Sequence, residues 1–200
     1  LPRLHDFEKR HPNMRVRLST SYFDWDFDAD NADVAIILAR KRSDDHHYRN
    51  LFRSRLKPVC SPDYLARVGN IATPQDLLRH KLLYVYSAEE DWRLWLKAAG
   101  LGETKLSSTL AFDSYLLAQE AAVAGQGIAM TIGPYARDEL ASGRLVQPVD
   151  LDVPHQHWWT FACRATDRLL PKVKLFEDWL LEQVASDEDI PATDRETSRA

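Results

Sequence analysis

The chain has 200 residues, of which 44% are hydrophobic and 28% are charged, and its formal net charge is −4. These values are typical of a soluble globular protein that folds without a metal or a disulfide, as one large domain or two small ones. The sequence contains no apolar run long enough to span a membrane. Because basic residues do not outnumber acidic ones, this segment is not expected to bind nucleic acid.

The sequence starts at Leu1 rather than at a methionine, and its first residues already have a helical pattern. We therefore expect a fragment of a longer protein, and no signal peptide is visible. The two cysteines, Cys60 and Cys163, stand in apolar surroundings, which leaves one disulfide or two buried thiols as alternatives. Buried thiols are the expected state in a reducing cytoplasm.

Local patterns predict the elements of the first part of the chain. Apolar residues at helical spacing end at Pro12, and the alternation of Met14, Val16 and Leu18 with polar residues is typical of a strand. The expected elements are a helix before Pro12, a strand over 14–18, a short helix or loop over 22–32, a buried strand over 33–39, a polar surface loop over 40–50 and an irregular strand over 51–60.

Capping residues predict where the next helices begin. The Ser-Pro pair at 61–62 and the Thr-Pro pair at 73–74 each combine an N-cap hydroxyl with a proline in the first turn. Ser87 and Glu90 have the spacing of a capping box, which predicts a third helix opening there. Strands are expected over 81–86 and 106–112.

Residues 112–133 are the most informative segment. Asp113 and Ser114 are both suitable N-caps for a nearly all-apolar helix that Gly125 can end, and a buried strand is expected over 127–132. Such a unit aims the free amides of the helix N-terminus at the carboxyl edge of a sheet, where open α/β folds bind small polar or anionic ligands. The alternative is a buried helix that binds nothing.

The remaining chain continues the alternation of helices and strands. Expected are a helix over 134–141, strands over 144–149 and 157–164, an amphipathic helix over 171–185 and a disordered acidic tail over 186–200. The whole pattern predicts an α/β fold with a largely parallel sheet or sheets.

Several short motifs stand in a fixed order along about residues 1–185. They are Leu-Pro-Arg-Leu at 1–4, His-Pro-Asn at 11–13, Asp-Val-Ala-Ile at 33–36, Leu-Phe at 51–52, Pro-Val-Cys-Ser-Pro-Asp-Tyr-Leu at 58–65, Thr-Pro-Gln-Asp-Leu at 73–77, Asp-Trp-Arg-Leu-Trp-Leu at 91–96, Phe-Asp-Ser at 112–114, Ala-Gly-Gln-Gly-Ile-Ala at 124–129 and Ala-Ser-Gly-Arg-Leu-Val at 141–146. In this order they resemble the effector-binding domain of LysR-type transcriptional regulators, in the branch with regulators of the glycine cleavage system and of β-lactamase.

The resemblance implies a two-lobed α/β fold like that of periplasmic binding proteins, in which each lobe is a mostly parallel sheet flanked by helices. Two crossing strands near 54–60 and 155–161 would join a first lobe of 1–56 plus 160–185 to a second lobe of 57–159. A small effector would bind in the interlobe cleft. The family's first effector-domain strand would precede this chain, which would leave the cleft incomplete here.

By position, the resemblance also implies a set of ligand contacts. They are Ser19, Thr20, Ser21, Phe112, Ser114, Tyr115, Thr131, Ile132 and Trp158. Hydroxyls beside a helix N-terminus suit a ligand with a carboxylate or an amide, and each charge-assisted bond contributes about 1.5–3 kcal/mol. Because Asp113 would repel an anion, we expect Asp113 to cap the helix and Ser114 to contact the ligand. An arginine common in the family's cleft is lost here or displaced to Arg40.

The predicted function is ligand sensing by the regulatory domain of a LysR-type DNA-binding transcription factor. We expect a cytoplasmic homodimer or tetramer assembled through the effector domain, with DNA bound only by an N-terminal winged helix-turn-helix outside this chain and no membrane partner. No catalytic residue, cofactor or metal site is predicted, because hydrolase and nucleotide motifs are missing and the histidines at 46–47 and 155–157 lack ligand spacing. The alternative is an extracytoplasmic solute-binding protein of the same fold, and an enzyme comes third.

Overall fold

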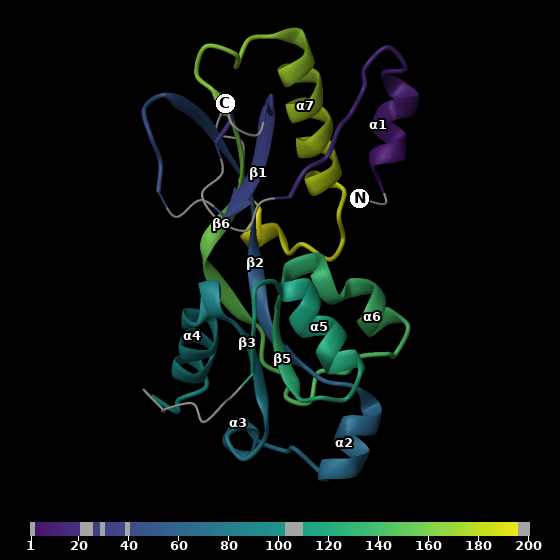
Figure 1. Ribbon diagram of the computed structural model, residues 1–200, viewed down its shortest axis with the longest axis vertical. Coiled ribbons are helices and arrows are strands. Elements are labelled where there is room, and N and C mark those ends of the chain that lie inside the picture. The colour runs from purple at the N-terminus through teal and green to yellow at the C-terminus, as the bar shows by residue number, and fades with distance from the viewer. Residues whose placement is uncertain (1–2, 21–25, 29–30, 39–40, 103–109, 196–200) are drawn as a thin grey trace. The chain divides into compact units, whose positions relative to one another are not determined.

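The computed structural model describes residues 3–20, 26–28, 31–38, 41–102 and 110–195. Its helices are α1 (Leu4–Arg10), α2 (Pro62–Val68), α3 (Pro74–Leu77), α4 (Glu90–Ala98), α5 (Tyr115–Val123), α6 (Arg137–Ala141) and α7 (Pro171–Ala185), with short 3-10 turns η1 (Tyr86–Ala88), η2 (Gly133–Ala136) and η3 (Ala192–Asp194). Its strands are β1 (Val34–Leu38), β2 (His46–Val59), β3 (Leu82–Val85), β4 (Leu110–Phe112), β5 (Ile128–Ile132) and β6 (Val153–Arg164). This alternation confirms the predicted α/β class (Figure 1).

The chain divides into two units. Unit 1 is Leu1–Arg53 with Gln156–Ala200, and unit 2 is Ser54–His155, so the chain passes from one to the other within β2 and within β6. The lobe limits suggested by the sequence, 1–56 plus 160–185 and 57–159, stay predictions.

The strand order is β1-β6-β2-β5-β3-β4. Strand β1 is antiparallel to β6 and β2 is antiparallel to β5, whereas β3 is parallel to both β4 and β5. The sheet is therefore mixed. The strands that pass between the units, β2 and β6, each run antiparallel to a neighbour, whereas β3 pairs in parallel with β4 and β5 in unit 2.

In unit 1, the long helix α7 covers a buried apolar core. Phe161 and Cys163 of β6 are fully buried beside Val173 and Val184 of the helix. The bounds of α7 confirm the amphipathic helix predicted over 171–185. Helix α1 packs on α7 through Phe7, which is 1% exposed.

A buried indole ties α1 to α7 and makes this docking sensitive to pH. The Trp179 Nε1–H donates to Asp6 Oδ2 over 3.0 Å, and this bond, with a smaller contribution from Arg10, lowers the pKa of Asp6. A carboxyl whose pKa is lower in the folded state contributes stability above its unfolded pKa and loses it as pH falls through the folded pKa.

Acidification is therefore expected to destabilise the wild-type chain more than an Asp6→Asn variant between about pH 6 and about pH 3. Urea unfolding at these pH values, followed by tryptophan fluorescence, checks this. Equal losses of stability in both proteins would mean that the Asp6–Trp179 bond does not carry the effect.

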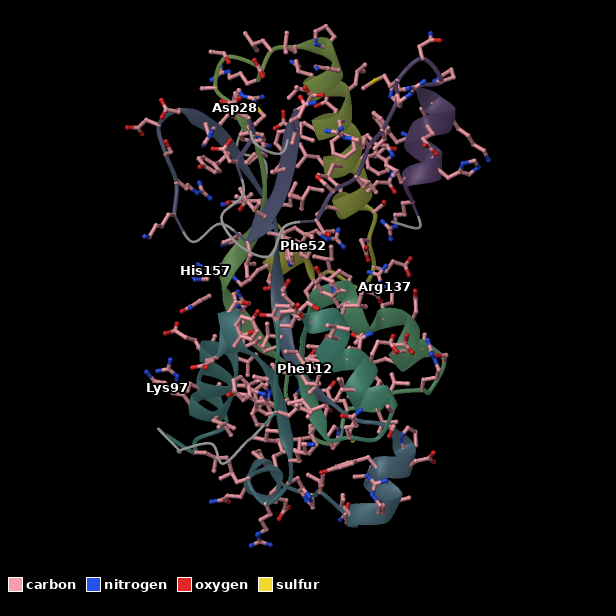
Figure 2. All side chains as sticks on the ribbon, in the orientation of Figure 1. Asp28, Phe52, Lys97, Phe112, Arg137 and His157 are labelled. Atoms are coloured by element: carbon pink, nitrogen blue, oxygen red, sulfur yellow. The ribbon has the colours of Figure 1, made fainter. Side chains whose placement is uncertain are left out.

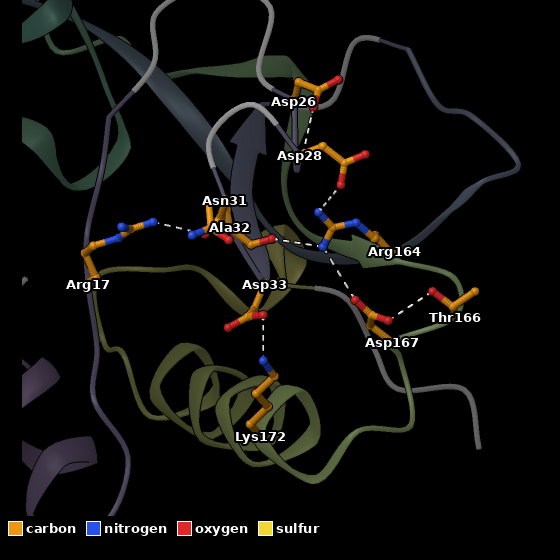
Figure 3. A network of polar contacts seen from close by, with 10 residues as sticks. All are labelled: Arg17, Asp26, Asp28, Asn31, Ala32, Asp33, Arg164, Thr166, Asp167 and Lys172. Carbon is orange, nitrogen blue, oxygen red and sulfur yellow. Dashed lines mark hydrogen bonds and ion pairs between the residues drawn. The ribbon is translucent and has the colours of Figure 1, made fainter.

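Hydrogen bonds and ion pairs connect the segment that precedes β1 to β6 and α7 of the same unit (Figure 3). Arg164 at the end of β6 donates to Asp28 Oδ1 over 2.6 Å and to the Ala32 carbonyl over 3.2 Å, while Lys172 of α7 donates to Asp33 over 2.7 Å. The hydrogen bond to Asp28 is the main reason why the pKa of Arg164 is raised. Asp28 and Asp33 thus have structural partners.

Two predictions for unit 1 are wrong. Residues 14–18 form no strand, because the alternation sets which side chains face outward but supplies no neighbouring strand to pair with. The polar loop over 40–50 is shorter than expected, since β2 already begins at His46. Pairing with the adjacent β6 overrides the low apolar content of that segment.

The tail also differs from its prediction. We expected disorder over 186–200, but Ile190 is 7% exposed and packs into the core of unit 1, and Arg195 forms a bridge with Phe52 of β2. Arg195 also donates to the Asp187 and Ile190 carbonyls, which fixes the turn between them. Ile190 and Arg195 thus help to dock this acidic segment on unit 1. Residues 196–200 lie outside the described ranges.

In unit 2, α5 packs on β3, β4 and β5 (Figure 1). The alanines of α5 allow this close approach, as Ala118 and Ala122 are fully buried against Leu83 and Ala129. Gly127 permits an equally close approach of backbone at the start of β5, because a Cβ there would lie 2.5 Å from the Lys81 carbonyl oxygen.

The predicted caps of α2 and α3 are present. Ser61 Oγ accepts from the Tyr64 amide, and Thr73 and Asp76 form a reciprocal capping box. The box expected at Ser87 and Glu90 does not open a helix, because a 3-10 turn precedes α4 and Glu89 takes the N-cap position. The strand expected over 144–149 is reduced to one bridge, between Val146 and Cys60, since the chain meets only the end of β2 there.

Candidate functional site

The carboxyl ends of the three parallel strands of unit 2 meet at one edge, and α5 begins there. Strand β4 ends at Phe112, labelled in Figure 2, and three residues later α5 opens at Tyr115. Strand β5 ends at Ile132 and leads directly into the turn η2. This edge of unit 2 therefore collects most of the residues that the sequence singled out.

Ser114, rather than Asp113, caps α5. The Ser114 side chain accepts from the Leu117 amide over 3.4 Å, and the residue is 5% exposed. The prediction that Asp113 is the cap is wrong, because Ser114 has the extended backbone that an N-cap needs and lies three residues before the amide it caps. Since its oxygen accepts this bond, the Ser114 O–H proton is the part of the group that a ligand could use.

Three residues of the segments near this edge carry buried polar atoms without partners. Within the described ranges, Ser54 Oγ, Thr131 Oγ1 and Asp113 Oδ1 are buried and have no hydrogen-bond partner. The Ser54 hydroxyl lies close to the backbone that follows β5, because a Cβ added to Gly133 would lie 2.8 Å from Ser54 Oγ. A buried hydroxyl that lacks a hydrogen bond costs about 1–3 kcal/mol, so a bound polar group would recover stability here.

The helix α5 adds a favourable potential to this edge. Its N-terminal amides and aligned peptide dipoles place partial positive charge at Ser114 and Tyr115. The first helical turn contains no acidic residue, although the Asp113 carboxyl group one residue before the cap offsets part of that charge. The edge is thus suited to a ligand that combines hydroxyl-binding groups with a carboxylate or an amide.

Tyr115 is engaged in a buried network instead of standing free. Its hydroxyl donates to Asp91 Oδ2 over 2.5 Å, and Asp91 Oδ1 lies 3.1 Å from His155 Nε2. Asp91 is 4% exposed and His155 is 1% exposed, while the Tyr115 ring stacks on Tyr135. This network fixes the first turn of α5 to α4 and β6, and thereby holds the edge in place.

The remaining residues predicted to contact a ligand differ in burial and in the unit to which they belong. Ile132 is fully buried and pairs with Leu56, so its side chain belongs to the core, and Phe112 packs partly on the core beneath α5. Ser19 and Thr20 are exposed in unit 1, whereas Ser21 and Arg40 lie outside the described residues. Trp158 is half-buried in unit 1, beside Arg53.

The cysteines are buried, and His47 has a carboxylate neighbour. Both cysteines are free and buried, as expected, and burial raises the pKa of the Cys60 and Cys163 thiols to about 11. Across the described ranges, no group of three or more His, Cys, Asp or Glu side chains is arranged to hold a metal ion. His47 lies 3.6 Å from Glu177 instead. None of the described helices is long and apolar enough to cross a bilayer.

Sequence reasoning missed three residues of this region, Ser54, Asp91 and His155. Ser54 stands between two arginines, a pattern typical of an exposed strand. Asp91 follows Glu89 and Glu90 and was indistinguishable from an exposed acid at a helix start. The signal for His155 is its place two residues before His157 near the expected crossing strand, a spacing that by itself suggests only a metal motif.

Comparisons with known proteins agree on one family. The family model described as the LysR substrate binding domain matches residues 1–185. The glycine cleavage system transcriptional activator of Escherichia coli strain K12 is 30% identical over 189 residues, which are 94% of this chain and 62% of that protein. The HTH-type transcriptional activator AmpR of Pseudomonas aeruginosa is 34% identical over 186 residues, which are 92% of this chain and 61% of that protein.

Solved structures give the same answer. The effector domain of the transcriptional regulator AmpR of Pseudomonas aeruginosa superposes with a TM-score of 0.80 at 32% identity, and the match covers 92% of this chain and 87% of that one. The AmpR effector binding domain of Citrobacter freundii has a TM-score of 0.80 at 26% identity, covering 93% and 91%. The chain spans about three fifths of the length of the curated relatives that it matches.

Proposed function

Because the chain belongs to the LysR substrate-binding domain family, we propose that it is the ligand-sensing part of a transcription regulator and that a small effector binds at the carboxyl edge of unit 2. The family resemblance predicted from the sequence motifs is confirmed. The observation that carries the proposed site is the pair of buried, unpartnered oxygens on Asp113 and Thr131, which stand at the strand ends where α5 begins.

The regulator is favoured over the alternative of an extracytoplasmic solute-binding protein. The curated relatives described above are transcriptional activators, and the solved neighbours are effector domains of such regulators. The same relatives support a binding function rather than catalysis. Recognition of a ligand by hydroxyls and a helix N-terminus also requires no nucleophile, metal or cofactor.

For the complete protein we propose DNA binding by a winged helix-turn-helix outside this chain, a homodimer or tetramer assembled through the effector domain, and a cytoplasmic location. Effector binding would act on DNA by favouring one arrangement of the two units over another. Such coupling requires unequal affinity of the effector for the two arrangements.

A thermal-shift screen of this chain with amino acids, aromatic acids and peptidoglycan fragments tests the proposal. A compound present at 100 times its Kd should stabilise the chain by about 2.7 kcal/mol, which is several degrees for a domain of this size. If no compound in these classes raises the Tm, the proposed sensing function is contradicted.

Two serine caps in unit 2 provide a matched pair of variants for any compound that binds. Ser114→Ala and Ser61→Ala each remove one N-cap bond and should each cost about 1 kcal/mol of stability. Only Ser114→Ala should weaken the compound, by about tenfold or more, since a lost hydrogen bond to a charged group is worth about 1.5–3 kcal/mol. Equal affinity in both variants would remove Ser114 from the site.

A further inference from the structure

Residues 186–195, which we call the strap, pack on unit 1 although they lie beyond the segment that the family model matches. That model matches residues 1–185. Within the strap, Ile190 belongs to the core of unit 1, and the acidic residues Asp187 and Asp194 are buried. Carboxylates are rarely taken out of water unless the structure compensates them. The strap is therefore a built part of unit 1 that the family match does not account for.

One end of the strap is fastened by Arg195. The Arg195 guanidinium donates to the Ile190 carbonyl over 2.9 Å, and it also donates to the carbonyls of Asp187 and Ala185. The backbone of Arg195 forms an antiparallel bridge with Phe52 of β2. Hydrogen bonds from a cation are stronger than neutral ones, so this side chain holds the strap closed against β2.

The other end of the strap holds the start of α1. Arg3 Nη2 lies 3.0 Å from Asp187 Oδ2, and Arg3 Nη1 donates to the Gln183 carbonyl of α7 over 2.7 Å. Arg3 is the N-cap residue of α1, and its carbonyl accepts from the Asp6 amide over 2.9 Å. Within the described residues no side chain caps α1, so the contacts of Arg3 help to keep the first turn of this helix closed.

Asp187 joins the two ends of the strap. Its carboxylate pairs with Arg3, and its carbonyl accepts from Arg195. A continuous path of polar contacts therefore runs from the start of α1 through the strap to Phe52 of β2. Strand β2 is one of the two strands that pass from unit 1 to unit 2, and Phe52 lies two residues before Ser54, where unit 2 begins. The strap thus links α1 to a crossing strand.

We propose that the strap couples α1 to β2, so that a change in the crossing strand is passed to α1 within unit 1. Coupling of this kind needs an element with two arrangements, and a short segment held by a few side chains can open locally while the rest of the domain stays folded. The inference rests on the proposed function, because it supplies a route by which a sensing domain passes on its state. It gives a regulatory role to residues outside the family match.

Hydrogen exchange of single backbone amides, followed by ¹H–¹⁵N NMR on this chain, tests the coupling in both directions. Arg195→Ala loosens the β2 end of the strap, and its readout is the Asp6 amide in α1. Arg3→Ala loosens the α1 end, and its readout is the Asp194 amide, which is hydrogen-bonded within the strap. Glu188→Ala, at an exposed position of the same segment, is the matched control.

Each arginine variant is expected to speed exchange of its distant amide about tenfold, because a coupling between two sites acts equally in both directions. Glu188→Ala should leave both rates unchanged. The buried Ile128 amide of unit 2, which donates to the Lys81 carbonyl, should keep its rate in every variant and so exclude global unfolding.

Exchange that speeds only at the mutated end would overturn the proposal, since the strap would then be a docked tail without a coupling role. Equal acceleration at the Ile128 amide would overturn it as well. If Arg195→Ala does not fold, Arg3→Ala decides alone, because the Arg3 side chain is 39% exposed and its loss leaves the core intact. A compound that raises the Tm in the screen, together with uncoupled ends, would sink the strap alone and leave the sensing function standing.

Discussion

Replacing Asp91 with alanine is expected to lower the free energy of unfolding by about 3–5 kcal/mol, the loss typical of removing one partner from a buried His–Asp pair. The Asp91 carboxyl group accepts from Tyr115 and lies 3.1 Å from His155 Nε2, and all three groups come from different elements. Without it, Tyr115 and the buried His155 each lose one hydrogen-bond partner. Urea unfolding followed by far-UV circular dichroism measures the change.

The neighbouring Glu90 offers a matched control, since its side chain is 68% exposed on the same helix. Glu90→Ala should change stability by no more than about 0.5 kcal/mol. A double-mutant cycle of Asp91→Ala with Tyr115→Phe should show coupling of about 0.5–3 kcal/mol. An Asp91→Ala protein as stable as Glu90→Ala would show that the network does not hold the first turn of α5.

Replacing Trp92 with alanine is expected to cost about 3–5 kcal/mol, because a fully buried indole is removed and a cavity is left. The Trp92 Nε1–H also donates to the Leu83 carbonyl oxygen over 2.9 Å, and the ring meets Trp95 edge to face. Trp92 therefore fastens α4 to β3. Thermal unfolding monitored by calorimetry measures the loss.

Leu116 of α5 is the matched surface control, as it is 52% exposed. Leu116→Ala should lie within about 0.5 kcal/mol of the wild type. If Trp92→Ala were no more destabilising than Leu116→Ala, the assignment of α4 to the core of unit 2 would be wrong.

The elements predicted well from the sequence are those whose signals are local. The hydroxyl–proline pairs of α2 and α3 and the apolar face of α7 lie within a few residues of the elements they define. Residues 14–18 and 144–149 show the opposite case, because their alternation is a strand pattern but a strand exists only where a neighbour pairs with it. The start of β2 was missed for the same reason.

The candidate site divides in the same way. Ser114 and Thr131 could be singled out because a capped helix and an apolar strand flank them, and the family motifs place them together. Ser54 could not, since the Arg-Ser-Arg sequence around it is that of an exposed strand. Only the neighbouring strands bury Ser54.

The most direct test of effector binding at the carboxyl edge of unit 2 is the backbone ¹H–¹⁵N spectrum of the chain with the compound that stabilises it most. The account predicts that the largest shifts fall on the amides of 114–117 and 131–133. Largest shifts around the α2 cap at 61–64, or equal shifts along the whole chain, would contradict it.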